Sequence, residues 1–228
     1  MSAADTAAGH APPIALSRFG RDDADEACRL FGEVYARREP LTVGVGQGAD
    51  AFAAWMRGAC PKAVDERLSI VARKADGGEP IGALIAEDGA TPYAATLPGR
   101  GDDPIHALLS GLDVEYRAGR TVRPGEWLHL SLLVVDDSAA GQGVASRMIE
   151  ACIGGAARRG WRLAYTEATH PGSQRAFARI GFETRLRRDY ARWRFGGSVP
   201  FRTVAAQGGV LLMDRALDGS AARGARGA

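Results

Sequence analysis

A glycine-bearing turn between an apolar strand and an amphipathic helix is the part of this sequence with the clearest chemistry. Residues 128–135 read LHLSLLVV, and the turn that follows them carries Gly141 and Gly143. Small residues at the start of a helix leave several backbone N–H groups pointing outward, at the positive end of the helix dipole. Such a turn suits a phosphate group, although short glycine patterns also occur in turns that bind nothing.

The elements around this turn must hold it in place. The helix after it has one apolar face, formed by Val144, Met148, Ile149, Cys152 and Ile153. A second strand over residues 162–169 and a short helix over residues 173–180 then lead to Gly181-Phe182. The order strand, turn, helix, strand predicts a cofactor-binding unit.

The remaining patterns predict further strands and helices on either side of this unit. Strands are expected at residues 14–18, 68–73, 80–86, 183–188 and 210–215. Helices are expected from Asp22 through Tyr35, over Ala49–Gly58 and over Ile105–Tyr116. Residues 87–126 form a long insertion that we expect near the substrate mouth.

Composition narrows the class of protein. A chain of 228 residues with 46% hydrophobic residues predicts a single globular domain over residues 13–217, flanked by disordered tails at 1–12 and 218–228. The net charge of +2 arises from 29 basic and 27 acidic residues, a balance that argues against a nucleic-acid partner.

Three widely spaced cysteines predict neither a disulfide framework nor a metal site. The sequence shows no secretion signal and no apolar run long enough to cross a membrane, so we expect a cytoplasmic protein without a membrane partner. Abundant Ala, Gly and Arg with little Lys favour a bacterial source.

Two motifs resemble those of the GNAT superfamily of N-acetyltransferases. Residues 140–145 (AGQGVA) resemble the family's Q/R-x-x-G-x-G/A signature, and Phe177 lies four residues before the Gly-Phe corner. The segment Glu39-Pro40-Leu41 is similar to the arylalkylamine and dopamine N-acetyltransferase-like branch. The resemblance implies an α/β (α+β) GNAT fold: a mixed, mostly antiparallel twisted sheet of about seven strands with helices on both faces.

The resemblance also implies acetyl-coenzyme A as the cofactor. Its pantetheine arm would pair with the backbone of Leu133, Val134 and Val135, which otherwise are simply a buried strand. Its pyrophosphate would lie on Gly141, Gln142, Gly143, Val144, Ala145 and Ser146. His170 and Phe177 would add cofactor contacts, unless His170 is only a loop residue before Pro171. Ala140 departs from the family's Arg or Gln, and Arg147 or Arg175 could compensate for it.

Two residues are candidates for the general base that acyl transfer to an amine requires. Glu39 corresponds to a glutamate base in the resembled branch, and the alternative is an exposed glutamate at a helix end. His129 lies on the central strand and titrates near neutrality, although a lone His on an apolar strand is commonly a core residue.

The general acid is less clear, because Phe177 stands where many family members have a tyrosine. Ser173, one helical turn earlier, matches a serine of the resembled branch and could contact the thiol. Tyr190 is a further candidate, although a tyrosine packed on a strand is the simpler interpretation.

The sequence therefore predicts an acetyl-coenzyme A-dependent N-acetyltransferase for a small primary amine. Some aromatic residues would suit an arylalkylamine and some acidic residues a polyamine, although both kinds are also typical of cores and surfaces. The aromatic candidates are Tyr35, Trp55, Tyr93, Tyr116 and Trp127, and the acidic ones are Asp102, Asp103, Asp113 and Glu115. Two alternatives remain: transfer to a protein or peptide amine, and a catalytically silent acyl-coenzyme A-binding sensor. The sequence leaves open whether the protein is a monomer or a homodimer.

Overall fold

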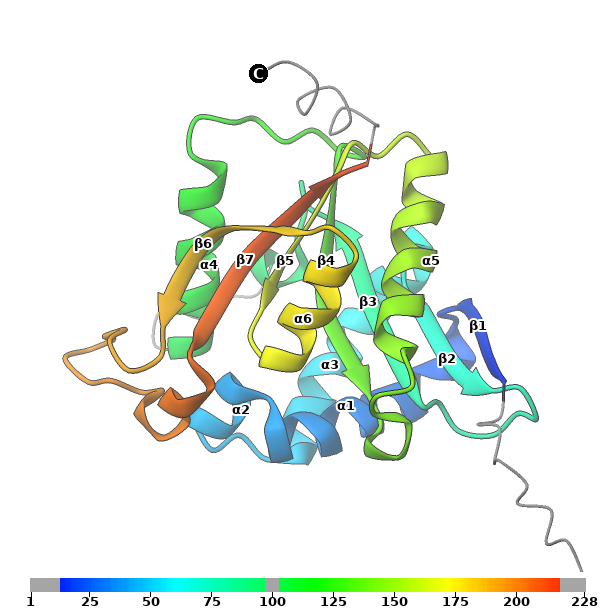
Figure 1. The fold of residues 1–228 in the computed structure, drawn as a ribbon, viewed down its shortest axis with the longest axis horizontal. Helices are drawn as coiled ribbons and strands as arrows, with labels where there is room; N and C mark the ends of the chain where they lie inside the picture. Colours follow the sequence, from blue (N-terminus) through cyan, green and yellow to red (C-terminus); the bar gives the residue numbers. More distant parts are fainter. Residues whose placement is uncertain (1–12, 97–102, 218–228) are drawn as a thin grey trace, which may run out of the picture.

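The computed structural model describes residues 13–96 and 103–217 (Figure 1). The tails predicted to be disordered lie outside these residues, as do residues 97–102 of the predicted insertion. Within the described chain, no helix combines the length and apolar character needed to cross a bilayer.

Seven strands form one sheet in the order β1-β2-β3-β4-β5-β7-β6. Their bounds are β1 Ile14–Arg18, β2 Ile70–Lys74, β3 Gly82–Asp88, β4 Trp127–Val135, β5 Leu163–Ala168, β6 Glu183–Asp189 and β7 Gly209–Ala216. β4 and β5 are parallel and every other neighbouring pair is antiparallel. The predicted mixed, mostly antiparallel sheet is confirmed.

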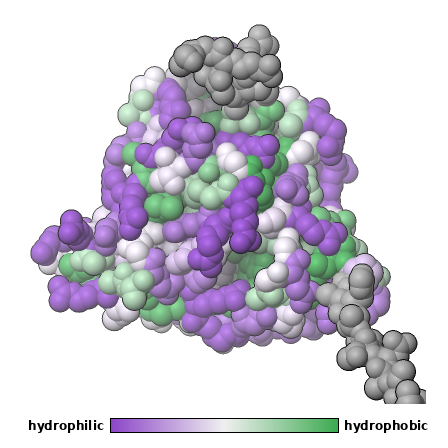
Figure 2. All heavy atoms as spheres, in the orientation of Figure 1, coloured by the Kyte–Doolittle hydropathy of each residue, from purple (hydrophilic) through white to green (hydrophobic). Residues whose placement is uncertain are grey.

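Helices cover both faces of this sheet. They are α1 Ala24–Arg38, α2 Pro40–Gly44, α3 Ala49–Glu66, α4 Pro104–Arg117, α5 Val144–Arg158 and α6 Pro171–Arg179. Short 3-10 turns are η1 Arg21–Asp23, η2 Tyr93–Thr96, η4 Asp137–Ala139 and η5 Arg202–Gln207. In Figure 1, α5 and α6 lie in front of the sheet, whereas α1, α3 and α4 lie behind it. Figure 2 shows the front surface as largely hydrophilic, with apolar residues in small groups.

Apolar residues form one core in front of the sheet and two behind it. The front core joins α5 and α6 to both halves of the sheet and includes Leu84, Met148 and Ala164. Behind the sheet, α1 and α3 pack on β3 and β4, whereas α4 packs on β5 and β7 in a separate cluster. Because side chains alternate along a strand, each strand contributes to both faces. The back face is thus divided near the boundary between β4 and β5.

One helix is longer than predicted, whereas the first ends close to its expected position. α1 ends at Arg38, just before Pro40, and Pro40 occupies the first position of α2, where a proline needs no N–H partner. The second helix was expected to end at Gly58, but α3 continues through Pro61 to Glu66. Buried Ala59, Cys60 and Ala63 hold this extension against the core.

Candidate active site

The sheet opens where β4 and β5 diverge. These strands pair over three positions only, the last of which joins His129 to Tyr165. Beyond it, the Thr166 hydroxyl donates a hydrogen bond to the Leu130 carbonyl at 2.9 Å. A bulge in the pairing of β3 with β4, at Ile85 and Ala86, bends β4 at the same level. From Ser131 onward, no strand of the described residues lies beside this edge of β4.

Backbone groups of Leu133 and Val135 point into this opening. The N–H of Asp136 donates to the Ile81 carbonyl before β3, so alternation along the strand turns Val134 toward β3 and its two neighbours away from it. Of the three residues predicted to pair with a pantetheine arm, Leu133 and Val135 therefore have suitably directed backbone groups. Those of Val134 are directed at β3.

Two side chains of α1 form hydrogen bonds with these backbone groups. The Tyr35 hydroxyl lies 3.2 Å from both the nitrogen and the oxygen of Leu133, accepting from the first and donating to the second. The Arg38 guanidinium donates to the Val135 carbonyl and pairs with Asp137. Burial, together with the nearby Glu39 carboxylate, raises the pKa of Tyr35, so its phenol stays protonated.

The glycine turn lies at the lower end of this opening, before α5. Gly141 and Gly143 have φ values of 77° and 75°, a region that favours glycine, and a Cβ at either would meet open space. Among the described residues no side chain caps α5, so the N–H groups of Val144, Ala145 and Ser146 remain available for an anion. This arrangement fits a pyrophosphate.

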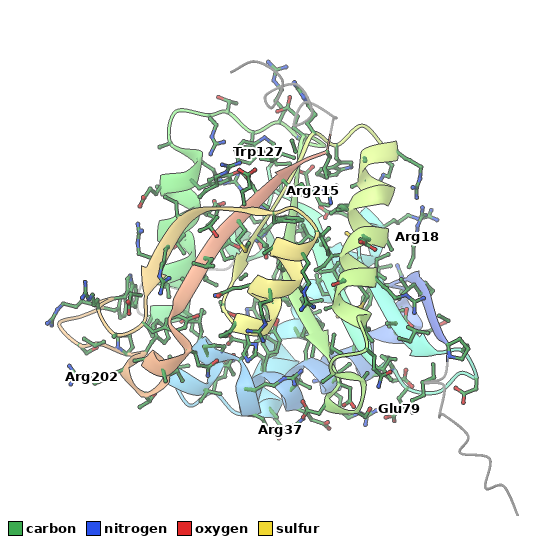
Figure 3. All side chains as sticks on the ribbon, in the orientation of Figure 1. Arg18, Arg37, Glu79, Trp127, Arg202 and Arg215 are labelled. Atoms are coloured by element: carbon green, nitrogen blue, oxygen red, sulfur yellow. The ribbon has the colours of Figure 1, made fainter. Side chains whose placement is uncertain are left out.

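The polar side chains near the turn form hydrogen bonds with the protein's own backbone. The Gln142 amide donates to the Ser138 carbonyl at 2.9 Å, and Arg147 donates to the Ile14 carbonyl. The Arg147 guanidinium thus contacts β1 rather than the space beside Ala140, where it was expected to compensate for the missing side chain. Arg175, the other candidate for that role, is exposed on α6. Arg37 pairs with Asp137 at 3.1 Å and lies at the bottom of the molecule in Figure 3.

Glu39 is buried, with 8% exposure, so the alternative of an exposed helix-end glutamate is wrong. Its side chain caps α2. Oε1 accepts from the Leu41 N–H at 3.0 Å, and Oε2 accepts from the Thr42 N–H and hydroxyl at 2.7 and 2.6 Å. Both oxygens thus hold α2 in place.

His129 lies between two carboxylates on the back face of the sheet. Its Nδ1 is 3.1 Å from Glu87 and its Nε2 is 2.7 Å from Glu167, while its ring stacks on Tyr165 with centroids 4.6 Å apart. Burial disfavours the imidazolium, but the two carboxylates outweigh it and raise the pKa of His129 to about 10. The side chain is protonated at neutral pH, which argues against the predicted role of His129 as a base.

The start of α6 brings His170 and Ser173 to the same end of β5. His170 Nδ1 accepts from the Gly172 N–H at 2.9 Å and so caps α6, and the Ser173 hydroxyl donates to the His170 carbonyl at 2.8 Å. Burial and then the nearby Arg38 charge lower the pKa of His170. His170 is therefore neutral at pH 7, with its proton on Nε2.

Phe177 and Tyr190 belong to the core. Phe177 packs edge-to-face on Phe182, and the Tyr190 hydroxyl donates a hydrogen bond to the Thr169 carbonyl at 2.8 Å. These contacts agree with the interpretation of Tyr190 as a tyrosine packed on a strand.

The aromatic residues expected near the substrate form two separate groups. On one side, Tyr35, Phe52, Trp55 and Tyr93 make a chain of ring contacts from α1 through α3 to η2. On the other, the rings of Tyr116, Trp127 and Tyr165 contact one another. The row Glu87, His129, Glu167 crosses the sheet behind β3, β4 and β5.

Sequence reasoning missed Arg38, Glu87 and Glu167 as residues of this site, and it expected Tyr35 near the substrate rather than on the Leu133 backbone. Glu167 carried a signal, because it is a charged residue inside the apolar strand of residues 162–169. The others give no signal in their own neighbourhood, since their contacts join segments far apart in the chain.

Comparison with known proteins identifies the segment that contains the opening and the glycine turn. Residues 117–193 match the family model for the acetyltransferase (GNAT) domain. The match spans 77 of the 228 residues and includes β4, α5, β5, α6 and β6. The match indicates an acyl-coenzyme A N-acyltransferase with acetyl-coenzyme A as its cofactor. Among curated protein sequences, none matches the chain.

Solved structures share the fold of this protein over 90% of its length. The C-terminal condensation domain of Ebony, in complex with β-alanyl-dopamine, matches over its whole chain with a TM-score of 0.81 and 12% identity. Arylalkylamine N-acetyltransferase 2 from Aedes aegypti matches over 99% of its chain, with a TM-score of 0.73 and 20% identity. The Drosophila melanogaster polyamine N-acetyltransferase matches over its whole chain, with a TM-score of 0.71 and 18% identity. These likenesses show the fold.

Proposed function

We propose that this GNAT protein transfers an acetyl group from acetyl-coenzyme A to the primary amine of a small molecule, either an arylalkylamine or a polyamine-like amine. One observation carries the proposal: an uncapped helix N-terminus with two positive-φ glycines lies at the end of an unpaired strand edge. The first feature suits a pyrophosphate and the second suits an amide-containing arm.

When bound, acetyl-coenzyme A supplies the activated thioester. The N–H groups of Val144, Ala145 and Ser146 would hold its phosphates, and Leu133 and Val135 would pair with the pantetheine arm. For that pairing, the Tyr35 hydroxyl must leave the Leu133 backbone. On the front side, Ser173 lies at the start of α6, where its hydroxyl could pass a proton to the leaving thiolate.

The amine would enter from the back of the sheet, between its two aromatic groups. An arylalkylamine would use the rings of Tyr35, Trp55 and Tyr93, and a polyamine would use the carboxylates of Glu87 and Glu167. The named activities of the Aedes and Drosophila structures support an amine of one of these kinds. A cytoplasmic location and a monomeric or homodimeric state belong to the same proposal.

The test is thiol release from acetyl-coenzyme A with tyramine, tryptamine, spermidine, an aminoglycoside and a peptide with a free N-terminus. Turnover of a small amine, with weak or no turnover of the peptide, is the expected result. Turnover of the peptide alone would instead indicate a protein or peptide N-acetyltransferase. Tight coenzyme A binding without turnover of any amine would indicate the silent sensor, which the buried Phe177 in place of a tyrosine favours.

A further inference from the structure

Hydrogen bonds restrict which side chain of the opening can take a proton from the substrate. Glu39 uses both carboxylate oxygens to cap α2. Both ring nitrogens of His129 are bonded to carboxylates. Glu87 also uses both oxygens in hydrogen bonds, one with His129 and one with the Tyr93 N–H at 2.7 Å. Each of these groups would have to break a buried contact in order to act as a base.

Glu167 differs from them in one respect. Its Oε2 is bonded to His129 at 2.7 Å, but its Oε1 accepts no hydrogen bond from the described residues. The side chain keeps 8% exposure, close to that of its partners Glu87 and His129, at 7% and 13%. One carboxylate oxygen of this buried row therefore remains available to a substrate.

The position of Glu167 suits an acceptor of the amine proton. It follows Tyr165 by two residues on β5, so it lies just past the last pairing with β4 and on the same face as His129. β5 forms one wall of the opening whose other wall is the free edge of β4. An amine that enters from the back of the sheet passes this wall before it reaches the β4 edge.

The charges around Glu167 sum to one negative charge. Glu87 on β3 and Glu167 on β5 are two carboxylates, and His129 on β4 is one imidazolium, because these carboxylates raise its pKa to about 10. On α4, Arg117 pairs with Asp113 at 2.5 Å and also contacts the Tyr165 hydroxyl, so that pair adds nothing to the sum. Tyr165 is neutral, because burial raises the pKa of its phenol. The site thus attracts an ammonium ion and can hold its proton.

We propose that Glu167 is the general base of this acetyltransferase and that His129 is a positioning residue that orients it. This inference rests on the proposed function. One proton of the substrate ammonium passes to Glu167 Oε1, and the amine nitrogen attacks the thioester carbonyl. The new C–N bond forms, the C–S bond breaks, and the second proton of the nitrogen leaves with the thiolate as thiol. Glu167 then returns its proton to solvent.

The experiment compares Glu167→Gln with the wild type and with a matched control, Glu183→Gln, whose side chain is 69% exposed on β6. With the amine that the wild type turns over best, Glu167→Gln should lower kcat/KM by at least about 100-fold, the size typical of a lost general base. Coenzyme A affinity should stay unchanged, and the control should match the wild type.

The pH profile separates a base from a merely structural residue. The deficit of Glu167→Gln should shrink as pH rises through the pKa of the substrate amine, because the amine then arrives without its extra proton. His129→Gln should keep substantial activity and lower kcat more than it changes KM, because it loosens the orientation of Glu167 without removing the base. The triple variant Glu87→Gln/His129→Gln/Glu167→Gln, which leaves no charge of this row buried, should repeat the loss if Glu167→Gln folds poorly.

Three results would overturn the inference. Activity of Glu167→Gln within about threefold of the wild type would show that Glu167 is not the base, because the loss of a general base lowers the rate far more than that. A deficit that stays constant across the pH range would assign Glu167 a structural role. A large loss in Glu39→Gln that is rescued by high pH would make Glu39 the base. Lack of turnover in the wild type would instead refute the proposed function, and the inference with it.

Discussion

The imidazole of His129 carries its charge in a buried position because a carboxylate lies on each side of it. A buried cation with two such partners is held in one orientation, and its ring also stacks on Tyr165. At the residue scale, the row Glu87, His129, Glu167 is therefore both an electrostatic feature of the site and a link between three strands. The charge of the His129 imidazole should therefore affect the free energy of unfolding.

Replacement of His129 by Gln should change how stability depends on pH. The folded pKa of about 10 exceeds the usual 6.5, so the stabilisation is fully present below pH 6.5 and is lost as pH rises toward 10. Urea unfolding of wild type and His129→Gln, compared at both ends of this window, checks it. The wild type should lose on the order of a few kcal/mol relative to the variant. A constant difference between the two proteins would show that His129 is neutral.

Among the elements, the unit from β4 to α5 could be predicted well from sequence, because its signals are local. An apolar strand, two glycines and a helical repeat lie next to one another, and the structure contains the strand, the turn and the helix at those positions. Pro40 gave an ambiguous signal, since a proline can follow one helix and begin the next. The end of α3 was missed because tertiary contacts of Ala63 and its neighbours decide it.

The candidate site was predictable only where it is made of consecutive residues. The phosphate turn meets that condition. The row of Glu87, His129 and Glu167 does not, because it depends on the pairing of β3, β4 and β5, and the bulge near Ser131 sets which residues face one another. Contacts of Tyr35 with Leu133 depend on how α1 packs beneath the sheet, which no local pattern encodes.

The turn before α5 should lose cofactor affinity when it gains a side chain. Gly143→Ala adds a methyl group at φ 75°, which costs about 1 kcal/mol in backbone strain and shifts the first N–H groups of α5. We expect the coenzyme A Kd to rise about tenfold, equivalent to about 1.4 kcal/mol, in isothermal titration calorimetry. Gly160→Ala, at φ 89° beyond the other end of α5, should cost similar stability and leave Kd unchanged. Equal Kd values for both variants would argue against a phosphate site at this turn.

Contacts of α1 with β4 should oppose cofactor binding. Tyr35→Phe removes the hydroxyl that occupies both backbone groups of Leu133, and the pantetheine arm would then not have to displace it. Since a hydrogen bond contributes about 0.5–1.5 kcal/mol, the coenzyme A Kd should fall by about 2- to 10-fold. Equilibrium binding of coenzyme A checks this, with Tyr93→Phe as the control in η2. Weaker binding by Tyr35→Phe would mean that the hydroxyl contacts the cofactor directly.

At the scale of the whole molecule, the two faces of the sheet have different organisation. The front core is continuous across β4 and β5, whereas the back is divided into the α1–α3 cluster and the α4 cluster. Trp127, on the α4 side, marks the upper end of the pairing between β4 and β5 in Figure 3. The continuous front core holds the two halves of the sheet together, so the divided back face can leave room for a substrate.

The strand order also fixes when this site can be completed during synthesis of the chain. β7 lies between β5 and β6, although it follows both in the sequence. β5 pairs with β7 at six positions but with β4 at only three, so most of its backbone partners emerge from the ribosome after every other strand. The nascent chain can therefore assemble β1 to β4 early, but the wall that carries Glu167 must wait for residues 209–216.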